Sequence, residues 1–527
     1  MRSFNIAGPC NSEMHYMVPA ESRTPDLGRS LEKHAYFAVH APRQSGKTTA
    51  MRALARRLTA EGRYAALHFS CESARTFTDV GSAEQQIWQV IAEEALRELP
   101  EALRPPDAIE TSEGGLLLVQ LRRWSERCPR PLVLIFDEID ALEGNALQSV
   151  LSQLRSAYPN RPNHFPSSVI LCGMKDVRDY KLASGSVEPV NAGSSSPFNI
   201  MEDSLRLPDF TQEQLRALYQ QHVTETGQPF TDDALARAWE LTRGQPWLSN
   251  AVAREVIEKM GVQPPTPITA AHIDEAKDRL INARGTHIDS LLARLKEDRV
   301  RRVLEPIIAG ELPLGDPLDD DYTYVRDMGL IAVDNPPRFS NPLYEEVVLR
   351  VLAGGAERAV SIKPSAFLLP NGRLDIRRVL TGFLAFWKEH GEILAGRMEY
   401  PEAAPQLVMM AWLLRFTNGA GGVLDREIGV STKRIDLLLR WPYLDGQGNR
   451  VWQREAFELK VWRDRDKRRD PVLSGLVQLD GYLERMGLDH GTLVVFDGRS
   501  VAEDIEDRSR IEEMLTPAGR VVTLLRG

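Results

Sequence analysis

The sequence predicts a multidomain α/β protein, and three observations support this prediction. The chain has 527 residues, enough for about three to four domains of roughly 100–200 residues each. Its composition, with 43% hydrophobic and 26% charged residues, is that of an ordinary globular protein. Within the first 200 residues, short apolar runs alternate with amphipathic segments. This alternation is typical of a parallel sheet that helices cover on both faces.

The N-terminal elements follow from this alternation. Strands are predicted at residues 36–41, 64–70, 132–136 and 169–171. Helices are predicted from Gly46 onward, at 116–124, and across a segment whose apolar side chains share one face, namely Ile87, Val90, Ile91 and Ala95. From Pro208 the strand signal disappears, and helical patterning continues to about Ala283. Thr211 and Gln214 have the spacing of a capping box that opens the first of these helices.

The remaining residues predict two further parts. Residues 287–352 combine helical segments with a short strand (330–333), a turn, a second short strand and a helix, which is the pattern of a winged helix. A linker follows. A second α/β unit is then predicted from helices at 402–416 and 476–486 and strands at 434–441, 452–462 and 491–496.

Charge and cysteine content exclude several classes of protein. The chain carries 65 Lys+Arg against 74 Asp+Glu, a net charge of -9, which excludes a protein that coats DNA through a general positive charge. The negative net charge does not exclude one local basic site that binds nucleic acid. The four cysteines form no CxxC pair, so neither a structural zinc site nor a disulfide framework is expected. The N-terminus lacks the apolar stretch of a signal peptide, and no apolar run is long enough to span a bilayer. We therefore expect a cytoplasmic protein without membrane contact.

A Gly-Lys-Thr motif follows the first predicted strand and opens a helix, in the sequence AVHAPRQSGKTTA. Such a loop presents backbone N–H groups to phosphate oxygens, and the positive end of the helix dipole adds to the attraction. Lys47 would reach the β- and γ-phosphates, and Thr48 would ligate Mg²⁺. Ala41 stands where the motif normally begins with glycine, and its small side chain keeps close backbone approach. The residues expected to bind the nucleotide are Arg43, Gln44, Ser45, Gly46, Lys47, Thr48 and Thr49.

An acidic pair at the end of another apolar strand supports this site. In LVLIFDEID, Asp137 is expected to hold Mg²⁺ through water, and Glu138 to orient and activate the attacking water. Either motif alone also fits a chance turn or solvated acids at a strand end. Together they stand about ninety residues apart and in the expected order, each at the carboxyl end of a strand, where open α/β sheets bind ligands. ATP and Mg²⁺ are therefore the predicted cofactors, and ATP hydrolysis is the predicted reaction.

Four more residues have two possible interpretations, a contact to the nucleotide or a structural role. Lys175, Asp176 or Arg178 could sense the γ-phosphate, and the same residues fit a solvated loop equally well. Arg243, in TRGQPWLSNAV, is a candidate sensor from the helical segment, while the Gly-Gln-Pro that follows it also fits a packing turn.

A second candidate site lies on two neighbouring C-terminal strands. Asp436 belongs to one strand, and Glu458 and Lys460 share one face of the next, because residues i and i+2 point to the same side. Two carboxylates can hold Mg²⁺, which polarises a scissile phosphate and lowers the pKa of bound water, while a lysine can stabilise developing negative charge. Gln478 and Tyr482 lie one turn apart on the following helix. Phosphates could also be contacted by the basic residues Arg463, Arg465, Lys467, Arg468 and Arg469.

The context of the Glu-x-Lys triplet decides its interpretation. The triplet alone says little, since Glu275 and Lys277 form another one in a predicted exposed helix. Glu458 and Lys460 would otherwise be an outward-facing pair on an edge strand. An Asp-bearing strand precedes them across a hairpin and a helix with Gln478 follows them, which together favour a metal-dependent nuclease fold.

On these residues, the chain resembles bacterial AAA-like ATPases of the archaeal and STAND types that carry a C-terminal PD-(D/E)XK nuclease domain. The resemblance rests on HYMVP, YFAVHAPRQSGKTT, LIFDEID, CGMKDVRDY, LRLPDFTQEQL, TRGQPWL, SNPLYEEVV, YPEAAPQL, KRIDLLL, FELKVW and QLDGYL. It implies a nuclease core of Asp436, Glu458 and Lys460, with Glu402 as a further metal ligand. Gln478 and Tyr482 look like the Q-x-x-x-Y element of RecB-like nucleases. Ile435 replaces the proline of the family motif.

The predicted organisation has four parts: an ATPase core at 1–206, a helical lid at 207–285, a winged helix at 286–355, and a linker with the nuclease-like domain at 356–527. The predicted function is an ATP-gated nuclease whose partner is nucleic acid, DNA in the first place, and the resemblance associates it by analogy with defence against phage. Homo-oligomerisation is left open. Two alternatives remain: a STAND-like nucleotide-controlled switch with a non-catalytic C-terminal domain, or a DNA-binding ATPase that uses its winged helix.

Overall fold

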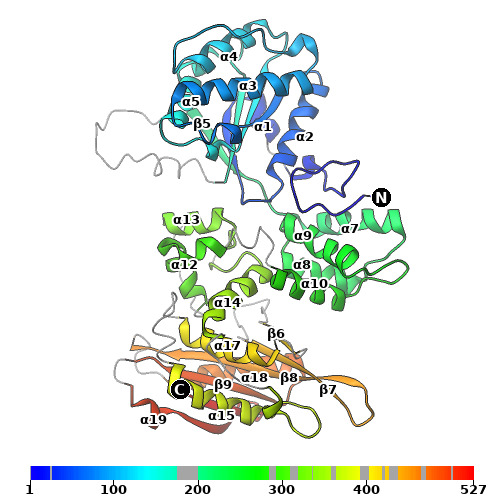
Figure 1. Cartoon of the computed structure of the whole chain (residues 1–527), viewed down its shortest axis with the longest axis vertical. Coiled ribbons are helices and arrows are strands. Elements are labelled where there is room, and N and C mark those ends of the chain that lie inside the picture. Colours follow the sequence, from blue (N-terminus) through cyan, green and yellow to red (C-terminus); the bar gives the residue numbers. More distant parts are fainter. Residues whose placement is uncertain are drawn as a thin grey trace. The chain divides into compact units, whose positions relative to one another are not determined.

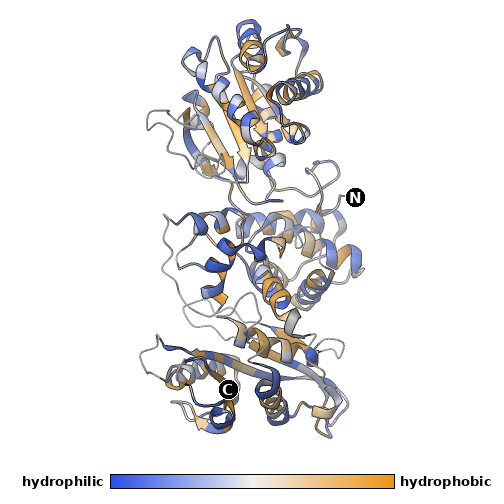
Figure 2. Cartoon of the chain, turned by 60° about the vertical axis from the view of Figure 1, so that its left-hand side comes forward, coloured by the Kyte–Doolittle hydropathy of each residue, from blue (hydrophilic) through white to orange (hydrophobic). Residues whose placement is uncertain are grey.

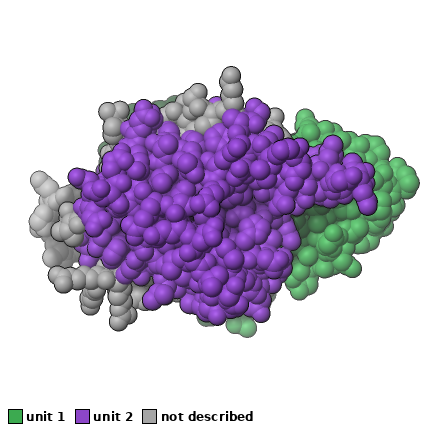
Figure 3. All heavy atoms as spheres, turned by 90° about the horizontal axis from the view of Figure 1, so that it is seen from below, with its two compact units in different colours: residues 1–289, 316–333 green, residues 290–315, 334–527 purple. Residues whose placement is uncertain are grey.

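The chain folds into two compact units (Figures 1 and 3). The first comprises Met1–Asp289 with Asp316–Val333, and the second comprises Ser290–Gly315 with Asp334–Gly527. The computed structural model describes residues 2–23, 27–174, 200–283, 292–308, 319–334, 336–357, 364–391, 403–417, 422–425, 437–464, 470–499 and 502–527.

The first unit is built on a five-stranded parallel sheet in the order β2-β3-β4-β1-β5. Its strands are β1 (Tyr36–His40), β2 (Ala65–Ser70), β3 (Leu132–Asp137), β4 (Ser168–Gly173) and β5 (Met201–Arg206). Every residue of β1 and of β3 is buried, which is why these strands are continuous apolar runs in the sequence. Figure 2 shows them in the hydrophobic colour. The four predicted strands are confirmed, and β5 is an additional edge strand with a polar sequence.

Helices cover both faces of this sheet, as predicted. One face packs against α3 (Val80–Glu98), α4 (Leu116–Arg127) and α5 (Gly144–Ser156). The other packs against α1 (Leu27–Glu32) and α2 (Lys47–Ala60). Successive residues of β1 serve the two layers in turn: Tyr36 and Ala38 belong to the first core, and Phe37 and Val39 to the second. Short 3₁₀ helices complete this part: η1 (Ala20–Arg23), η2 (Glu72–Ala74), η3 (Glu101–Leu103), η4 (Ile139–Ala141) and η5 (Tyr158–Asn160).

The helical segment predicted after residue 208 is also confirmed. It consists of α7 (Gln212–Thr226), α8 (Asp232–Thr242), α9 (Pro246–Arg254), the π-helical turn η7 (Glu255–Lys259) and α10 (Ala270–Ala283). The predicted capping box is present: Gln214 N donates to Thr211 Oγ1 at 3.2 Å, and Thr211 N donates to Gln214 Oε1 at 2.9 Å. The N-terminal residues lie against α7, where Gln221 Nε2 donates to the Met17 carbonyl at 2.8 Å.

The stretch predicted as a winged helix is divided between the two units. Helix α13 (Asp320–Asp327) belongs to the first, while η8 (Ala293–Lys296), α12 (Asp298–Ile308) and α14 (Pro342–Glu357) belong to the second. In residues 319–334 and 336–357, the predicted short strands are reduced to single bridge residues at Ile331 and Phe339. The winged-helix domain therefore stays a prediction.

The second unit contains a six-stranded mixed sheet in the order β10-β11-β9-β8-β7-β6. Its strands are β6 (Val423–Asp425), β7 (Leu437–Leu444), β8 (Arg450–Trp462), β9 (His490–Asp497), β10 (Arg510–Leu515) and β11 (Val521–Arg526). The β8–β9 and β9–β11 pairs are parallel and the others are antiparallel. The predicted second α/β unit is thus confirmed as a mixed sheet with helices.

Helices also pack against both faces of the second sheet. On one face, α18 (Val472–Met486) forms a core with Ala456, Leu493 and Leu524 of the strands. On the other, Phe496 of β9 contacts Phe383 of α15 (Ile376–Phe386) and Trp387 of the π-helical turn η10 (Trp387–Gly391). Helix α17 (Ala404–Thr417) adds Trp412 to this aromatic cluster. The remaining short helices are η9 (Pro364–Phe367) and α19 (Ile505–Arg508).

Across the part of the chain that the structure describes, every helix is too short or too polar to cross a membrane.

Candidate functional site

The loop between β1 and α2 is shaped to receive an anion. Gln44 and Gly46 have φ angles of 56° and 82°, in the left-handed region. Left-handed residues in a loop turn the backbone so that successive N–H groups point to one side. Gly46 is the N-cap of α2, and among the described residues no side chain caps this helix. The first backbone N–H groups of α2 can therefore bind a ligand.

Lys47 is held at the centre of this loop. Its Nζ donates to the carbonyl oxygens of Ala41 at 2.6 Å and Pro42 at 2.9 Å. Burial lowers the pKa of Lys47, while the nearby carboxylate of Asp137 counteracts this effect. Phosphate oxygens can replace the two carbonyls as acceptors, and they compensate the buried charge better because they are anionic.

Asp137 ends β3 beside the loop and is 1% exposed. Its Oδ2 is 2.9 Å from His68 Nε2, and its Oδ1 accepts from the Glu138 N–H at 2.9 Å. Burial by itself raises the pKa of Asp137, but the hydrogen bond and charge of His68, with hydrogen bonds from Thr48 and the Glu138 N–H, leave this pKa below its ordinary value. Asp137 is therefore an anionic carboxylate at neutral pH, hydrogen-bonded to Thr48, and both residues are predicted to hold Mg²⁺.

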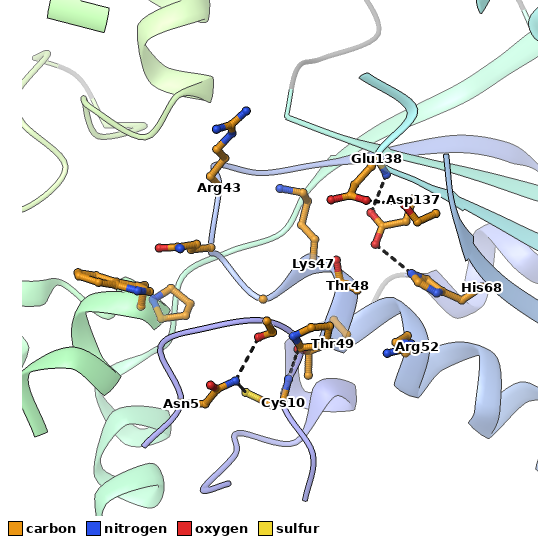
Figure 4. Close-up of a pocket in the computed structure, with 18 of the residues that line it drawn as sticks. Asn5, Cys10, Arg43, Lys47, Thr48, Thr49, Arg52, His68, Asp137 and Glu138 are labelled. Atoms are coloured by element: carbon orange, nitrogen blue, oxygen red, sulfur yellow. Dashed lines mark hydrogen bonds and ion pairs between the residues drawn. The ribbon is translucent and has the colours of Figure 1, made fainter. Parts of the chain in front are cut away.

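Glu138 is exposed, and its backbone is strained. Its φ of 55° is in the left-handed region, which costs a non-glycine residue about 1–3 kcal/mol and is concentrated at functional sites. The Ser70 hydroxyl donates to the Glu138 carboxylate. Figure 4 shows Glu138, Asp137, Lys47 and Thr48 around one space.

These residues belong to a cavity of about 580 Å³. All of the predicted nucleotide-binding loop residues line it except Ser45, which is buried behind the loop. The N-terminal segment forms one wall: Cys10 N donates to Thr49 Oγ1 at 3.0 Å, a bond marked in Figure 4. Arg23, 6% exposed, stacks on Phe210 with 5.0 Å between its Cζ and the ring centroid. Burial lowers the pKa of Arg23 to about 10, so the guanidinium stays charged at neutral pH.

One part of the cavity wall is apolar. It is lined by Tyr16, Met17, Val18, Phe210, Leu218, Pro246 and Trp247. Trp247 Nε1 donates to the Ile6 carbonyl at 2.9 Å, which joins the N-terminal segment to α9. A wall of this kind suits the faces of a nucleobase. The cavity thus combines an anion-binding loop with an apolar compartment.

Of the four predicted sensor residues, Arg243 is the one within the described residues. Arg243 ends α8 with a φ of 48° and is half-buried, but it is not among the residues that line the cavity. Its role stays a prediction. Lys175, Asp176 and Arg178 lie outside the described residues.

The second candidate site is formed on β8. Glu458 is 1% exposed, and its Oε1 is 2.8 Å from Lys460 Nζ. Both side chains lie on the face of β8 that also carries Ala456, a member of the core between the sheet and α18. The structure thus brings a buried carboxylate and an ammonium group together, as the i, i+2 spacing predicts.

The other predicted members of this site divide into two groups. Tyr482, 2% exposed, and the half-buried Gln478 lie on α18, which packs on the same face of the sheet. Glu402, Asp436 and the basic residues 465–469 lie outside the described residues, whereas Arg463 is described. Among the described residues, no group of three or more His, Cys, Asp and Glu side chains could hold a metal ion. A metal shell at Glu458 therefore depends on predicted ligands.

One family model matches a part of the first unit. Residues 32–180 match the family model of the AAA domain. The chain therefore contains an AAA-type P-loop ATPase module. A search of curated proteins finds no match.

Three solved structures illustrate what the chain is similar to. A Walker-type ATPase of Pyrococcus abyssi is 15% identical, with a TM-score of 0.46, over 66% of this chain and 99% of that chain. The RuvB Holliday junction branch migration motor of Thermotoga maritima is 13% identical, with a TM-score of 0.33, over 62% of this chain and 92% of that chain. The Drosophila ORC bound to DNA is 14% identical, with a TM-score of 0.35, over 77% of this chain and 87% of that chain.

Several residues that complete the nucleotide cavity were not predicted from the sequence. His68 and Ser70 are polar residues two apart at the carboxyl end of a buried strand, and this pattern at a ligand-binding sheet edge could have identified them. Cys10 and Arg23 reach the loop only through the tertiary fold, so no local pattern marks them.

Proposed function

We propose that this protein is an ATP-dependent, metal-dependent nuclease, with DNA as the first substrate to test, in which the ATPase module controls cleavage by the second unit. The observation that carries this proposal is the presence of two separate chemical sites on one chain. One is the loop with Lys47, Asp137 and Glu138, and the other is the buried Glu458–Lys460 pair on β8.

The nucleotide cavity has the groups that ATP hydrolysis requires. The loop N–H groups and Lys47 would bind the phosphates, and Thr48 and Asp137 would hold Mg²⁺, which would supply positive charge to the phosphate oxygens. Glu138 is exposed toward the same space, and its carboxylate orients the attacking water and accepts its proton.

In the second unit, Glu458 is the proposed metal ligand, together with Asp436 and Glu402. A carboxylate is the ligand type that Mg²⁺ prefers, and a bound metal would polarise the phosphodiester and acidify a water. The register supports the grouping, because Leu437 of β7 pairs with Phe457 of β8, next to Glu458. Lys460 would stabilise negative charge on the phosphate, with Gln478 as a further polar contact from α18.

A packed connection behind the nucleotide loop supports the proposed control. His40, the last residue of β1, lies 3.9 Å from the buried Asp327 carboxylate of α13. Gly329 lies so close to Pro42 of the loop that an added Cβ would be 2.6 Å from the proline ring. The chain continues from this segment into α14 of the second unit. A rearrangement of the loop on nucleotide binding would therefore reach the segment that leads to the nuclease unit.

The test uses purified full-length protein with a mixture of labelled single- and double-stranded DNA, Mg²⁺ and ATP. Lys47→Ala is expected to abolish both ATP hydrolysis and ATP-stimulated cleavage, whereas Lys460→Ala should abolish cleavage and leave ATP hydrolysis intact. Glu275→Ala, in the other Glu-x-Lys triplet, is the matched control and should change neither activity. Cleavage that survives Lys460→Ala would refute the nuclease assignment.

The two alternatives predict different outcomes in the same assays. A nucleotide-controlled switch would show slow ATP hydrolysis, a nucleotide-dependent change of oligomeric state, and no cleavage in any metal. A DNA-binding ATPase would show DNA-stimulated hydrolysis without cleavage.

A further inference from the structure

The hairpin of β7 and β8 carries three arginines and an exposed tryptophan on one face. Arg440 pairs with Arg454, and Trp452 pairs with Pro442 across the two strands. On β8, residues 450, 452 and 454 are exposed, while 453 and 455 are buried, which is the alternation of a strand with one face in solvent. We call Arg440, Arg450, Trp452 and Arg454 the hairpin face.

The side chains of the hairpin face are arranged around the indole. Trp452 is 43% exposed, and the Cζ atoms of Arg440 and Arg450 lie 5.8 Å and 5.5 Å from its ring centroid. These are cation–π distances. Arg440 Nε also donates to Asp425 Oδ2 at 2.7 Å, and Arg454 donates to the Met486 carbonyl at 3.2 Å. Two guanidinium groups thus lie within cation–π distance of the indole.

Stability explains only part of this arrangement. Arg440 is paired with Asp425, yet it also faces Arg454, and like charges directly opposite each other on neighbouring strands are destabilising. An exposed indole adds little to the core of the unit. An anionic partner with flat rings would instead satisfy both the arginines and the indole.

The hairpin face continues into the candidate nuclease site. Arg450, Trp452 and Arg454 share the face of β8 that carries Glu458 and Lys460. Trp452 and Glu458 are six residues apart, a distance of about 20 Å along a strand. In Figure 1, the β7–β8 ribbon extends beyond the neighbouring strands of its sheet. Ala456, between the hairpin face and Glu458, is buried under α18, so a polymer that leads from the hairpin toward Glu458 has to pass around this helix.

We propose that the hairpin face binds nucleic acid with unpaired bases, one base stacking on Trp452 while Arg450 and Arg454 contact the adjacent phosphates. Stacking on an aromatic side chain requires a free base face, which a single strand offers and the interior of a duplex does not. The direction of the bound strand rests on the proposed nuclease function of Glu458. The binding itself does not depend on it.

The experiment measures binding of a fluorescein-labelled oligothymidylate of about 20 nucleotides, a length that covers one to several single-strand sites. Full-length protein is used in EDTA, so that no metal-dependent cleavage occurs. We expect Trp452→Ala to weaken binding by about ten-fold or more, and Trp452→Phe to retain most of the affinity. Arg450→Ala combined with Arg454→Ala should lower the slope of log K against log salt by about 1.4, or about 0.7 per lost phosphate contact.

Two control variants test whether the effect belongs to the hairpin face. Leu515→Ala removes an exposed apolar side chain of β10, at the other edge of the sheet, and Arg377→Ala removes an exposed arginine of α15. Both should bind as the wild type does. Unchanged binding by Trp452→Ala and by the double arginine variant would overturn the proposal, as would equal affinity for a blunt duplex. If Lys460→Ala still cleaves while Trp452→Ala fails to bind, the nuclease assignment fails and the hairpin proposal stands.

Discussion

At the scale of single residues, Arg23 shows how the N-terminal segment contributes to the nucleotide cavity. Its Nη2 donates to the Pro208 carbonyl at 2.6 Å. Its Nη1 lies 2.9 Å from the position of a Cβ added to Gly46. A positive charge is therefore held beside the loop that is expected to receive the phosphates. Since Gly46 also has a φ of 82°, even alanine at this position would be strained and would displace the guanidinium.

Removing this charge is expected to weaken nucleotide binding. Arg23→Met keeps most of the side-chain volume but removes the guanidinium, so we expect the Kd for ATP to rise about ten-fold, in line with about 1.5 kcal/mol for a charged hydrogen-bonding group. Arg23→Lys keeps the charge and should lose less. The Kd is measured by titration with a fluorescent ATP analogue. Equal affinities for the wild type and Arg23→Met would show that Arg23 has only a packing role.

His490 gives the second unit a pH-dependent contribution to stability. Its Nε2 is 3.1 Å from Glu455 Oε2, and this hydrogen bond raises the pKa of His490 above its ordinary value, although burial and Arg373 act in the opposite direction. A raised pKa in the folded state means that the contribution is complete below the unfolded pKa of about 6.5 and is lost as pH rises through the folded pKa.

His490→Gln keeps a hydrogen-bond donor for Glu455 and removes the titration. We expect the free energy of unfolding of the wild type to exceed that of this variant at pH 6 by well under 1 kcal/mol, because the imidazole is half exposed, and the difference to disappear at pH 9. A difference that is constant from pH 6 to pH 9 would contradict this account. The comparison is made by urea denaturation followed by tryptophan fluorescence.

At the scale of elements, the turn between α8 and α9 positions the apolar part of the nucleotide cavity. Phe210 N donates to the Gly244 carbonyl at 2.9 Å. A Cβ on Gly244 would lie 2.0 Å from the Phe210 carbonyl oxygen, and the φ of Gly244 is +78°. Only glycine allows this close approach. Phe210 and Pro246, on either side of this contact, both line the cavity.

Gly244→Ala is expected to destabilise the first unit by about 3 kcal/mol or more, because positive-φ strain and a backbone clash add together. ATP binding should weaken at the same time. Gly227→Ala is the matched control: its φ is +73°, but an added Cβ meets nothing within 4 Å. It should cost about 1 kcal/mol and leave ATP affinity unchanged. The free energy of unfolding of both variants is measured by urea denaturation. If both variants lose similar amounts, the close approach of Phe210 is not what requires glycine at position 244.

The elements that could be predicted from the sequence are those whose burial leaves a pattern. Strands β1 and β3 are buried at every residue, so their apolar runs indicated both the sheet and the loop that follows it. The edge strands β5 and β10 were missed because their sequences, MEDSLR and RIEEML, contain no buried residue and no apolar run. Strand β11 was also missed, although its sequence, VVTLLR, is apolar and half of its residues are buried. Within the nucleotide cavity, the loop and the Asp137–Glu138 pair are contiguous motifs. Arg23 reaches the cavity only through the tertiary fold.

At the scale of the whole molecule, the segment that packs behind the nucleotide loop is the proposed route of control. Pro42 of the loop contacts the segment at Gly329, whose φ is +81°. Arg206 of β5 donates to the Arg326 carbonyl at 3.4 Å, and His40 faces Asp327. Three contacts from the sheet and the loop thus hold a segment that continues into the second unit. Control requires that nucleotide binding changes the energy of these contacts.

Gly329→Ala tests this route from outside both sites, and the Kd for ATP is measured as well because the added Cβ meets Pro42 of the nucleotide loop. An added Cβ would lie 2.6 Å from Pro42 and is strained by the positive φ, so the segment must move away from the loop. We expect the ATP stimulation of cleavage to fall several-fold, while cleavage without ATP stays at the wild-type level because Glu458 and Lys460 are unchanged. Gly261→Ala, with a φ of +69° and nothing within 4 Å of the added Cβ, is the matched control and should keep full stimulation. Both rates are measured on labelled DNA with and without ATP. If ATP stimulates cleavage by Gly329→Ala as strongly as it does in the wild type, nucleotide control of cleavage does not pass through the contact between Gly329 and Pro42.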